Sequence, residues 1–364
     1  DVSDKLEITL TVGPDQFLNT AKIRAARVCW AQVISACGGS SSQNPVTIHA
    51  QTAQAMLTKT DSWVNMLRAT TACFAAAAGG ADAITVAPFD DALGLSNDMG
   101  LRLARNTQLI LQEETKLSAV IDPAGGSWYV EELTDQVANS AWETFQDLER
   151  QGGLGVALLS GYWQEALAET RSERNKAVAD RSMPLTGTSE FPNLGEQLLD
   201  REPLPQDPEV LEGEQRCEAL PLFRWSAPFE TMREAATTSA KEPVIFLANL
   251  GEIATHTARS TFALNLFEAG GIRVLNNDGF ANTTACVEAF SASNTRIACI
   301  CSSDSVYSES ASQTAQDLRD AGATLVYLAG NPTVLAEADT DIDGFIYLGC
   351  DVLEALTPIH QLLN

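Results

Sequence analysis

The chain has 364 residues, of which 45% are hydrophobic and 20% charged, as in a globular protein of two or three domains. It carries 48 acidic residues against 23 lysines and arginines, a formal net charge of −25. This acidity argues against nucleic acids and anionic membrane surfaces as partners, because both would repel the chain.

Three strand–helix units are predicted at the start of the chain. The expected strands cover residues 5–12, 46–50 and 83–87, and the expected helices cover residues 14–37, 62–78 and 98–114. Three units are too few to form a closed barrel by themselves, since a barrel of this type needs eight strands.

Helices and a long connecting segment are predicted next. A proline and two adjacent glycines indicate a turn within residues 122–129, and apolar stripes predict helices over residues 131–150, 155–160 and 163–179. Residues 181–241 contain seven prolines among many acidic residues. We expect this stretch to wrap a surface as a linker and not to form a core.

The last third of the chain predicts an open parallel sheet. Residues 243–271, PVIFLANLGEIATHTARSTFALNLFEAGG, contain a buried strand at 244–250 and a helix from His256 onward. Later strands are expected at 272–275, 296–301, 324–328 and 344–348, with helices at 284–290, 308–321, 334–338 and 352–363. This alternation is typical of a doubly wound α/β sheet, whose ligands bind at the carboxyl ends of the strands.

Two stretches resemble the methylmalonyl-CoA mutases, closest to their small, or beta, subunit. FLANLG and HTARSTFALNLFEAGG are similar to the C-terminal domain of that family, and the stretch from RAARVCWAQV to DPAGGSWYVEELT resembles the end of its substrate-binding barrel. The resemblance implies the last three βα units of a TIM barrel at 1–130, a helical subdomain and wrapping linker at 131–242, and a flavodoxin-like, cobalamin-binding-type domain at 243–364. It also implies that the first five barrel units lie outside this chain, removed by truncation or present on a separate polypeptide.

The resemblance also defines a cofactor loop. Catalytic subunits of the family carry Asp-x-His-x-x-Gly there, and the His binds cobalt. Here His256 has Ala254 in place of the Asp and Arg259 in place of the Gly, and the Ser-x-Leu of a second loop is replaced at 301–303. Because a metal-bound imidazole is normally held by a carboxylate, we predict a degenerate site in which His256 is a polar residue near a helix start.

Residues of the family's barrel site are only partly retained. His49 and Gln51 match a His and a Gln that line the substrate and corrin side in catalytic subunits, and Asp91 stands where a longer acid meets the adenosyl group. Neighbouring residues of that site are replaced. We therefore predict no catalytic residue and no metal ligand, with His49, Gln51 and Asp91 as the weak candidates and His49 as a buried, hydrogen-bonded histidine.

Other polar and sulfur-containing residues are assigned structural roles. His360 is expected to be a favourable charge near a helix end, and Asp90 to be solvated or a helix cap. The eight cysteines lack CxxC spacing and are expected to be reduced core thiols of a cytoplasmic protein, with Cys299 and Cys301 on one sheet face. Neither a signal peptide nor a membrane span is predicted.

These observations predict the non-catalytic structural subunit of a heterodimeric methylmalonyl-CoA mutase. By this interpretation a large catalytic subunit binds adenosylcobalamin and interconverts succinyl-CoA and (R)-methylmalonyl-CoA, and a separate chain could supply the N-terminal barrel half. The alternative is a divergent catalytic subunit that binds cobalamin through His256. A third hypothesis is an interaction module without a mutase partner.

Overall fold

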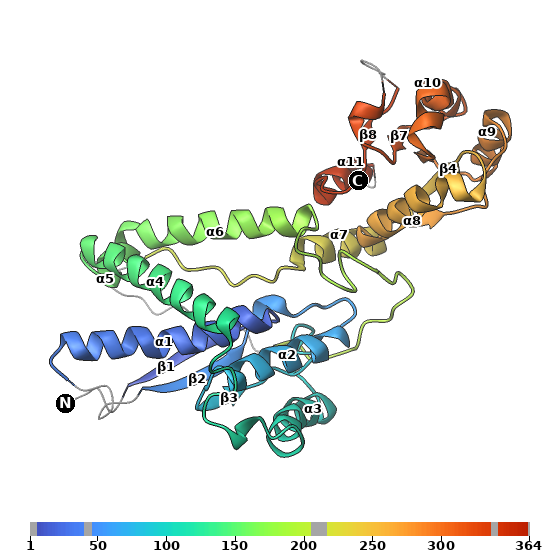
Figure 1. Ribbon diagram of the computed structural model, residues 1–364. Helices are drawn as coiled ribbons and strands as arrows, with labels where there is room; N and C mark the ends of the chain where they lie inside the picture. The colour runs from blue at the N-terminus through green and yellow to red at the C-terminus, as the bar shows by residue number, and fades with distance from the viewer. Residues whose placement is uncertain (1–5, 40–45, 205–216, 336–340, 363–364) are drawn as a thin grey trace. The chain divides into compact units, whose positions relative to one another are not determined.

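The computed structural model describes residues 6–39, 46–204, 217–335 and 341–362. The chain forms two compact units, each with its own parallel sheet (Figure 1). Unit 1 comprises residues 1–171 and 198–225, and unit 2 comprises residues 172–197 and 226–364. Within the described ranges, no helix combines the length and the apolar character that crossing a membrane requires.

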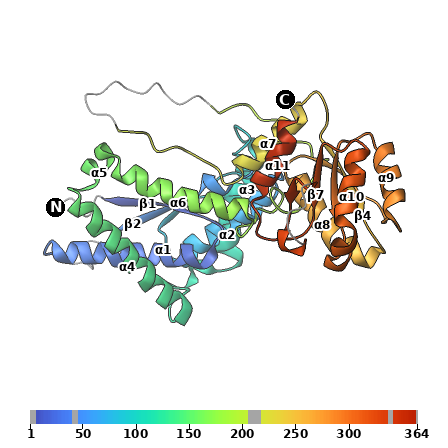
Figure 2. The same cartoon turned by 90° about the horizontal axis from the view of Figure 1, so that it is seen from above.

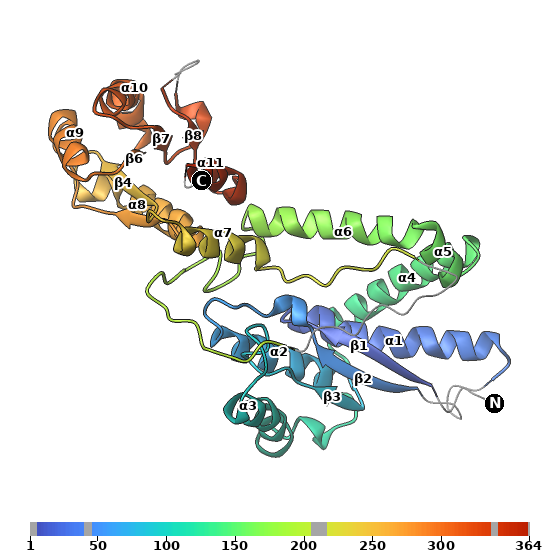
Figure 3. The ribbon, with the colours of Figure 1, turned by 180° about the vertical axis from the view of Figure 1, so that it is seen from behind.

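Unit 1 is built on three parallel strands, which run side by side in the order β1–β2–β3 (Figure 3). Their bounds are Glu7–Val12, Thr47–Thr52 and Ala83–Thr85. One face of this sheet is apolar and packs on α1 (Gln16–Ala36) and α2 (Val64–Ala78). The other face carries polar side chains that are half-buried or exposed, namely Glu7, Thr9, Thr11, Thr47, His49, Gln51 and Thr85. Parallel sheets are usually covered on both faces, whereas these side chains form an open polar face in the part of the protein described.

The helices that follow β3 complete unit 1. After α3 comes a π-helical turn, then α4, which packs along α1 (Figure 1), and α6, which continues into unit 2. Their bounds are α3 Asp98–Leu109, the π turn Ile110–Glu114, α4 Trp128–Arg150, α5 Leu154–Ser160 and α6 Tyr162–Ala179, with short 3-10 turns at Gln54–Met56 and Leu117–Ala119.

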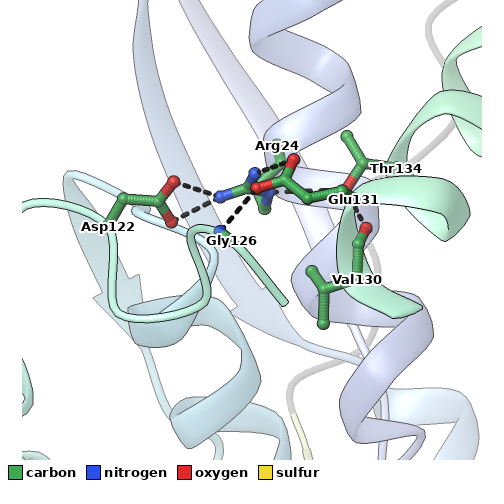
Figure 4. A network of polar contacts seen from close by, with 6 residues as sticks. All are labelled: Arg24, Asp122, Gly126, Val130, Glu131 and Thr134. Carbon is green, nitrogen blue, oxygen red and sulfur yellow. Dashed lines mark hydrogen bonds and ion pairs between the residues drawn. The ribbon is translucent and has the colours of Figure 1, made fainter. Parts of the chain in front are cut away.

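An arginine of α1 holds the turn that precedes α4 (Figure 4). Arg24 forms ion pairs with Asp122 and, at 2.6 Å, with Glu131. The Gly126 amide donates to Glu131 Oε1 at 2.9 Å, and this bond, followed by the one from Arg24, lowers the pKa of Glu131. The glycine-rich turn predicted at 122–129 is therefore fixed against both helices.

Unit 2 contains a five-stranded parallel sheet in the order β5–β4–β6–β7–β8. Phe246 and its neighbours on one face pack on α9 and α10, which lie together in Figure 2. On the other face Phe267 of α8 meets Tyr327 edge-on at 5.6 Å, and the Tyr327 hydroxyl donates to the Ala355 carbonyl of α11. The bounds are β4 Val244–Asn249, α8 Ile253–Ala269, β5 Arg273–Leu275, α9 Thr283–Ala292, β6 Ile297–Cys301, α10 Asp304–Asp320, β7 Leu325–Leu328, β8 Gly344–Phe345 and α11 Val352–Gln361.

The segment predicted as a linker contains one further helix, α7 (Ala227–Thr238). Phe229 is fully buried in it, and the Arg233 guanidinium donates to the Ala269 carbonyl at 3.2 Å and to the Thr188 carbonyl at 3.1 Å. This part of the segment therefore belongs to a core, contrary to the prediction. Pro228 does not prevent the helix, because it lies in the first helical turn, where proline is tolerated. The helix predicted at 334–338 is a 3-10 turn at Pro332–Val334, and residues 336–340 lie outside the described residues.

Candidate functional site

In the unit 2 sheet β5 is added on one side of β4, and the later strands are added on the other side, beginning with β6. The order of the strands therefore changes direction between β4 and β6, and ligands of such sheets bind at this switch point. Here side chains of the protein bridge the two strand ends. Ser302 donates from Oγ to the Leu250 carbonyl at 2.8 Å, and its amide donates to the Tyr307 hydroxyl at 2.7 Å. Arg259 of α8 pairs with Asp304 of α10 at 2.9 Å.

The loop between β5 and α9 closes the end of β4. The Gly251 amide donates to the Phe280 carbonyl at 3.0 Å, and the Phe280 amide donates to the Asn249 carbonyl at 2.8 Å. Asn277 Nδ2 donates to the Leu247 carbonyl at 2.7 Å. These bonds fix residues 276–280 over the strand end where a ligand of this fold class would enter.

His256 is enclosed by that loop. It lies within α8 and not in the loop before it, and it is only 3% exposed. Its Nε2 is 3.3 Å from the Asp278 carbonyl oxygen and its Nδ1 is 3.5 Å from Ser260 Oγ. A Cβ added to Gly279 would stand 2.5 Å from Nε2. The structure thus places His256 near a helix start, as predicted, but far more deeply buried than the sequence indicates.

The cobalamin site implied by the family does not match the surroundings of His256. Both imidazole nitrogens face protein atoms, and the carbonyl and hydroxyl beside them replace the carboxylate that would orient a cobalt ligand. The position of the family's glycine is filled by Arg259, which is engaged with Asp304. The residues at this edge therefore do not fit a lower axial ligand of cobalt. Among the residues that the structure describes, no cluster of three or more His, Cys, Asp or Glu could hold a metal ion.

His49 lies on the open polar face of unit 1. Its Nε2 is 2.8 Å from Thr85 Oγ1 on β3, and its Nδ1 is 3.4 Å from Glu7 Oε1 on β1. The prediction of a hydrogen-bonded histidine is confirmed, but its side chain remains 23% exposed and is not buried. Gln51 is exposed on the same face, and its register partner on β3 is Thr85.

Asp91 lies beside a buried ion pair that the sequence did not reveal. Burial, and then the charge of Asp90, raises the pKa of Asp91, which contacts Gln54 Nε2 at 3.4 Å. Asp90 is fully buried and accepts from Arg201 Nε and from Ser96 Oγ, both at 2.6 Å. The prediction that Asp90 is solvated is therefore wrong. The described hydrogen bonds and ion pairs do not join Asp91 to His49 or Gln51.

His360 agrees with its prediction in position but not in charge. Its Nε2 donates to the Gly270 carbonyl at 3.0 Å, and burial lowers its pKa. His360 lies in the last turn of α11, as predicted, but it is half-buried, and its lowered pKa disfavours the charge expected there. Cys299 and Cys301 do share one sheet face, with their sulfur atoms 3.9 Å apart, as predicted. Burial raises the pKa of Cys73 to about 11, so that thiol is suited to packing and not to reactivity.

The two sheets define an α/β protein whose C-terminal sheet has the layout of a ligand-binding domain with its switch point filled by its own side chains. The family model described as methylmalonyl-CoA mutase matches residues 1–258, and the chain belongs to this family.

Its relatives include several mutase small subunits. The chain is 44% identical over 361 residues to the methylmalonyl-CoA mutase small subunit of Streptomyces virginiae, covering 97% of this chain and 56% of that protein. It is 36% identical over 366 residues to the small subunit of Propionibacterium freudenreichii subsp. shermanii, covering 99% and 56%. The methylmalonyl-CoA mutase of Escherichia coli (strain K12) is 33% identical over 195 residues, 52% of this chain and 27% of that protein. The chain thus spans little more than half the length of the small subunits it matches.

Proposed function

We propose that this chain is part of the structural subunit of a heterodimeric methylmalonyl-CoA mutase and does not itself carry out the isomerisation. A large partner subunit would hold adenosylcobalamin and interconvert succinyl-CoA and (R)-methylmalonyl-CoA. The enclosure of His256 beneath residues 276–280 is the observation that carries this proposal. The similarity to named small subunits over nearly the whole chain supports it.

The architecture supports a common origin with cobalamin-binding domains. Numbered within unit 2, the strand order is 2-1-3-4-5, which is the flavodoxin-like order. We further propose that unit 1 contains the last three βα units of a TIM barrel, because its polar sheet face resembles a barrel interior that other strands would cover. The missing units would come from another part of the protein or from a separate chain. The eight free cysteines agree with a reducing cytoplasm.

Cobalamin titration tests the proposal. Adenosylcobalamin is added to the purified chain and to His256→Ala, and the absorbance of the cobalamin is followed. We expect no shift toward a histidine-ligated spectrum in either protein, and a coloured complex only after co-expression with a longer mutase chain. A shift in the unchanged chain that disappears in His256→Ala would favour the catalytic alternative.

A second variant distinguishes two reasons for the absence of cobalamin binding, namely the missing motif residues and the covering loop. Ala254→Asp with Arg259→Gly restores the family's loop sequence around His256 but leaves residues 276–280 in place. Because that loop still encloses the imidazole, we expect the double variant to bind no cobalamin. Binding by this variant would show that the lost carboxylate and glycine, and not the enclosure, account for the absence of binding.

A further inference from the structure

In each of the two units, one aspartate joins the shortest described strand of the sheet to its neighbour. In unit 1 this strand is β3, which has three residues, and Asp82 directly precedes it. The Asp82 amide donates to the Ile48 carbonyl of β2 at 2.8 Å. The Asp82 carboxylate accepts from the Ile48 amide at Oδ2, also at 2.8 Å. A single residue therefore binds both backbone hydrogen-bonding groups of Ile48.

The aspartate is held in turn by an arginine of the helix that precedes β2. Arg27 of α1 donates from Nη2 to Asp82 Oδ2 at 2.8 Å and from Nη1 to the Val46 carbonyl at 2.9 Å. Val46 lies two residues before Ile48. The guanidinium thus connects the carboxylate to the start of β2, and hydrogen bonds between charged groups are stronger than those between neutral groups.

Unit 2 repeats the same contacts at its own shortest described strand, β8, which has two residues. Asp343 directly precedes β8, its amide donates to the Val326 carbonyl of β7 at 2.8 Å, and its Oδ2 accepts from the Val326 amide at 2.7 Å. Arg319 of α10, the helix that precedes β7, pairs with Asp343. It also donates from Nη1 to the Thr324 carbonyl, two residues before Val326, at 2.6 Å. The arginine and aspartate are 55 residues apart in unit 1 and 24 in unit 2, so the arrangement is shared in space and not in sequence spacing.

Short strands depend most on such contacts. A strand of two or three residues forms few ladder bonds, and a slip of one residue would turn its side chains to the opposite face. Ile48 and Val326 are both fully buried, so either amide would be costly to leave without an acceptor. The four charged side chains are between 24% and 46% exposed, and an ion pair with this exposure contributes little by itself. The bond from the carboxylate to the buried amide is therefore the main contribution.

We propose that the pairs Asp82–Arg27 and Asp343–Arg319 are clamps that attach β3 and β8 to their neighbours and fix their register. The carboxylate meets the amide of the neighbouring strand only in the observed register, and the arginine holds the carboxylate in that position. Each clamp acts locally, because the longer strands of the sheet are joined by their own ladders. Loss of a clamp opens one end of the sheet and leaves the rest of the unit folded.

Hydrogen exchange of backbone amides in the intact chain tests this proposal. In Asp343→Ala the amides of Val326 and Ile346 should exchange about 30-fold faster, while the amides of β4 change less than about twofold. Glu242→Ala is the matched control in the same unit. It removes the ion pair of Glu242 with Arg273, at 2.9 Å, whose carboxylate accepts from no strand amide among the described hydrogen bonds. Exchange in β4 and β5 should therefore remain within about twofold in this control.

Further variants distinguish the clamp from a simple ion pair. Asp343→Asn keeps an acceptor oxygen but loses the charge, so the Val326 amide should exchange only about fivefold faster. Asp82→Ala should accelerate the Ile48 amide about 30-fold and leave unit 2 unchanged. Unchanged exchange in either alanine variant, an equal increase throughout a unit, or an asparagine variant as impaired as the alanine variant would overturn the proposal. If Asp343→Ala does not fold by circular dichroism, the position of the faster amides in Asp343→Asn decides the question.

Discussion

Replacing Gly279 by alanine tests whether the loop between β5 and α9 packs tightly over His256. The added Cβ would lie 2.5 Å from His256 Nε2 and 2.7 Å from the Gly251 carbonyl oxygen, at a residue whose φ is +99°. Backbone strain of about 1 kcal/mol and overpacking of about 2 kcal/mol predict a total loss of about 3 kcal/mol in the free energy of unfolding.

Gly251→Ala is the matched control for the backbone term. Gly251 has a similar φ of +89°, but a Cβ there would meet no atom closer than 3.5 Å. Only the strain then remains, so the loss should be about 1 kcal/mol. The difference between the two variants, about 2 kcal/mol, measures how tightly the loop is packed.

A double-mutant cycle with His256→Ala assigns the clash to the imidazole. His256→Ala alone should cost about 2 kcal/mol, mostly from lost packing, because its hydrogen bonds of 3.3 and 3.5 Å are long. In the double variant the imidazole is absent, and the Cβ added at position 279 meets only the Gly251 carbonyl oxygen. The double variant should therefore lose about 1 kcal/mol less than the sum of the two single variants.

Urea unfolding followed by far-ultraviolet circular dichroism is the appropriate assay. Tryptophan fluorescence would report on the other unit, because all six tryptophans belong to unit 1, at positions 30, 63, 128, 142, 163 and 225. Equal losses in Gly279→Ala and Gly251→Ala, with no coupling to His256→Ala, would refute the enclosure of the imidazole. Cobalt could then reach the His256 imidazole, contrary to the proposed function.

Three other properties can be measured on the same protein. Asp90→Asn should destabilise unit 1 by about 3 kcal/mol, since Arg201 would lose its fully buried partner; a loss below about 1 kcal/mol in a fluorescence-monitored urea titration would contradict this. Burial holds the pKa of His360 below its usual 6.5, so the unfolded chain binds this proton more readily and stability should fall as the pH drops from 7 to 5. His360→Gln should flatten that slope in unfolding experiments at stepped pH, and an unchanged slope would count against it. Only the exposed Cys37 and Cys217 should react at once with a thiol reagent, and a third fast thiol in the native protein would show that a buried cysteine is accessible.

Sequence patterns predicted the elements whose signals are local. The strands at 244–250 and 296–301 are short apolar runs, and the structure has them at Val244–Asn249 and Ile297–Cys301. The π-helical turn at Ile110–Glu114 was not predicted, because its residues continue the apolar pattern of α3. Helix α7 was missed because the prolines around it indicate a linker over a much longer stretch.

At the candidate sites, contacts between residues that are far apart in the sequence could not be predicted. The sequence shows that Ala254 and Arg259 interrupt the cobalt-binding motif, but not that residues 276–280 cover His256. Asp90 appears solvated in the sequence because Arg201, its partner, follows 111 residues later. Likewise, the contacts of His49 with Glu7 and Thr85 depend on strand register, which the strand pattern alone does not specify.

The interleaved connectivity of the two units bears on how the protein is synthesised. The chain completes unit 1 only with residues 198–225, after it has already produced residues 172–197 of unit 2. During translation that early piece of unit 2 must wait for residues 226–364, so its partners, such as Asn265 for Glu190, emerge from the ribosome much later. Neither unit can be expressed whole as one uninterrupted fragment, and folding from the N-terminus cannot finish one unit before it has begun the other.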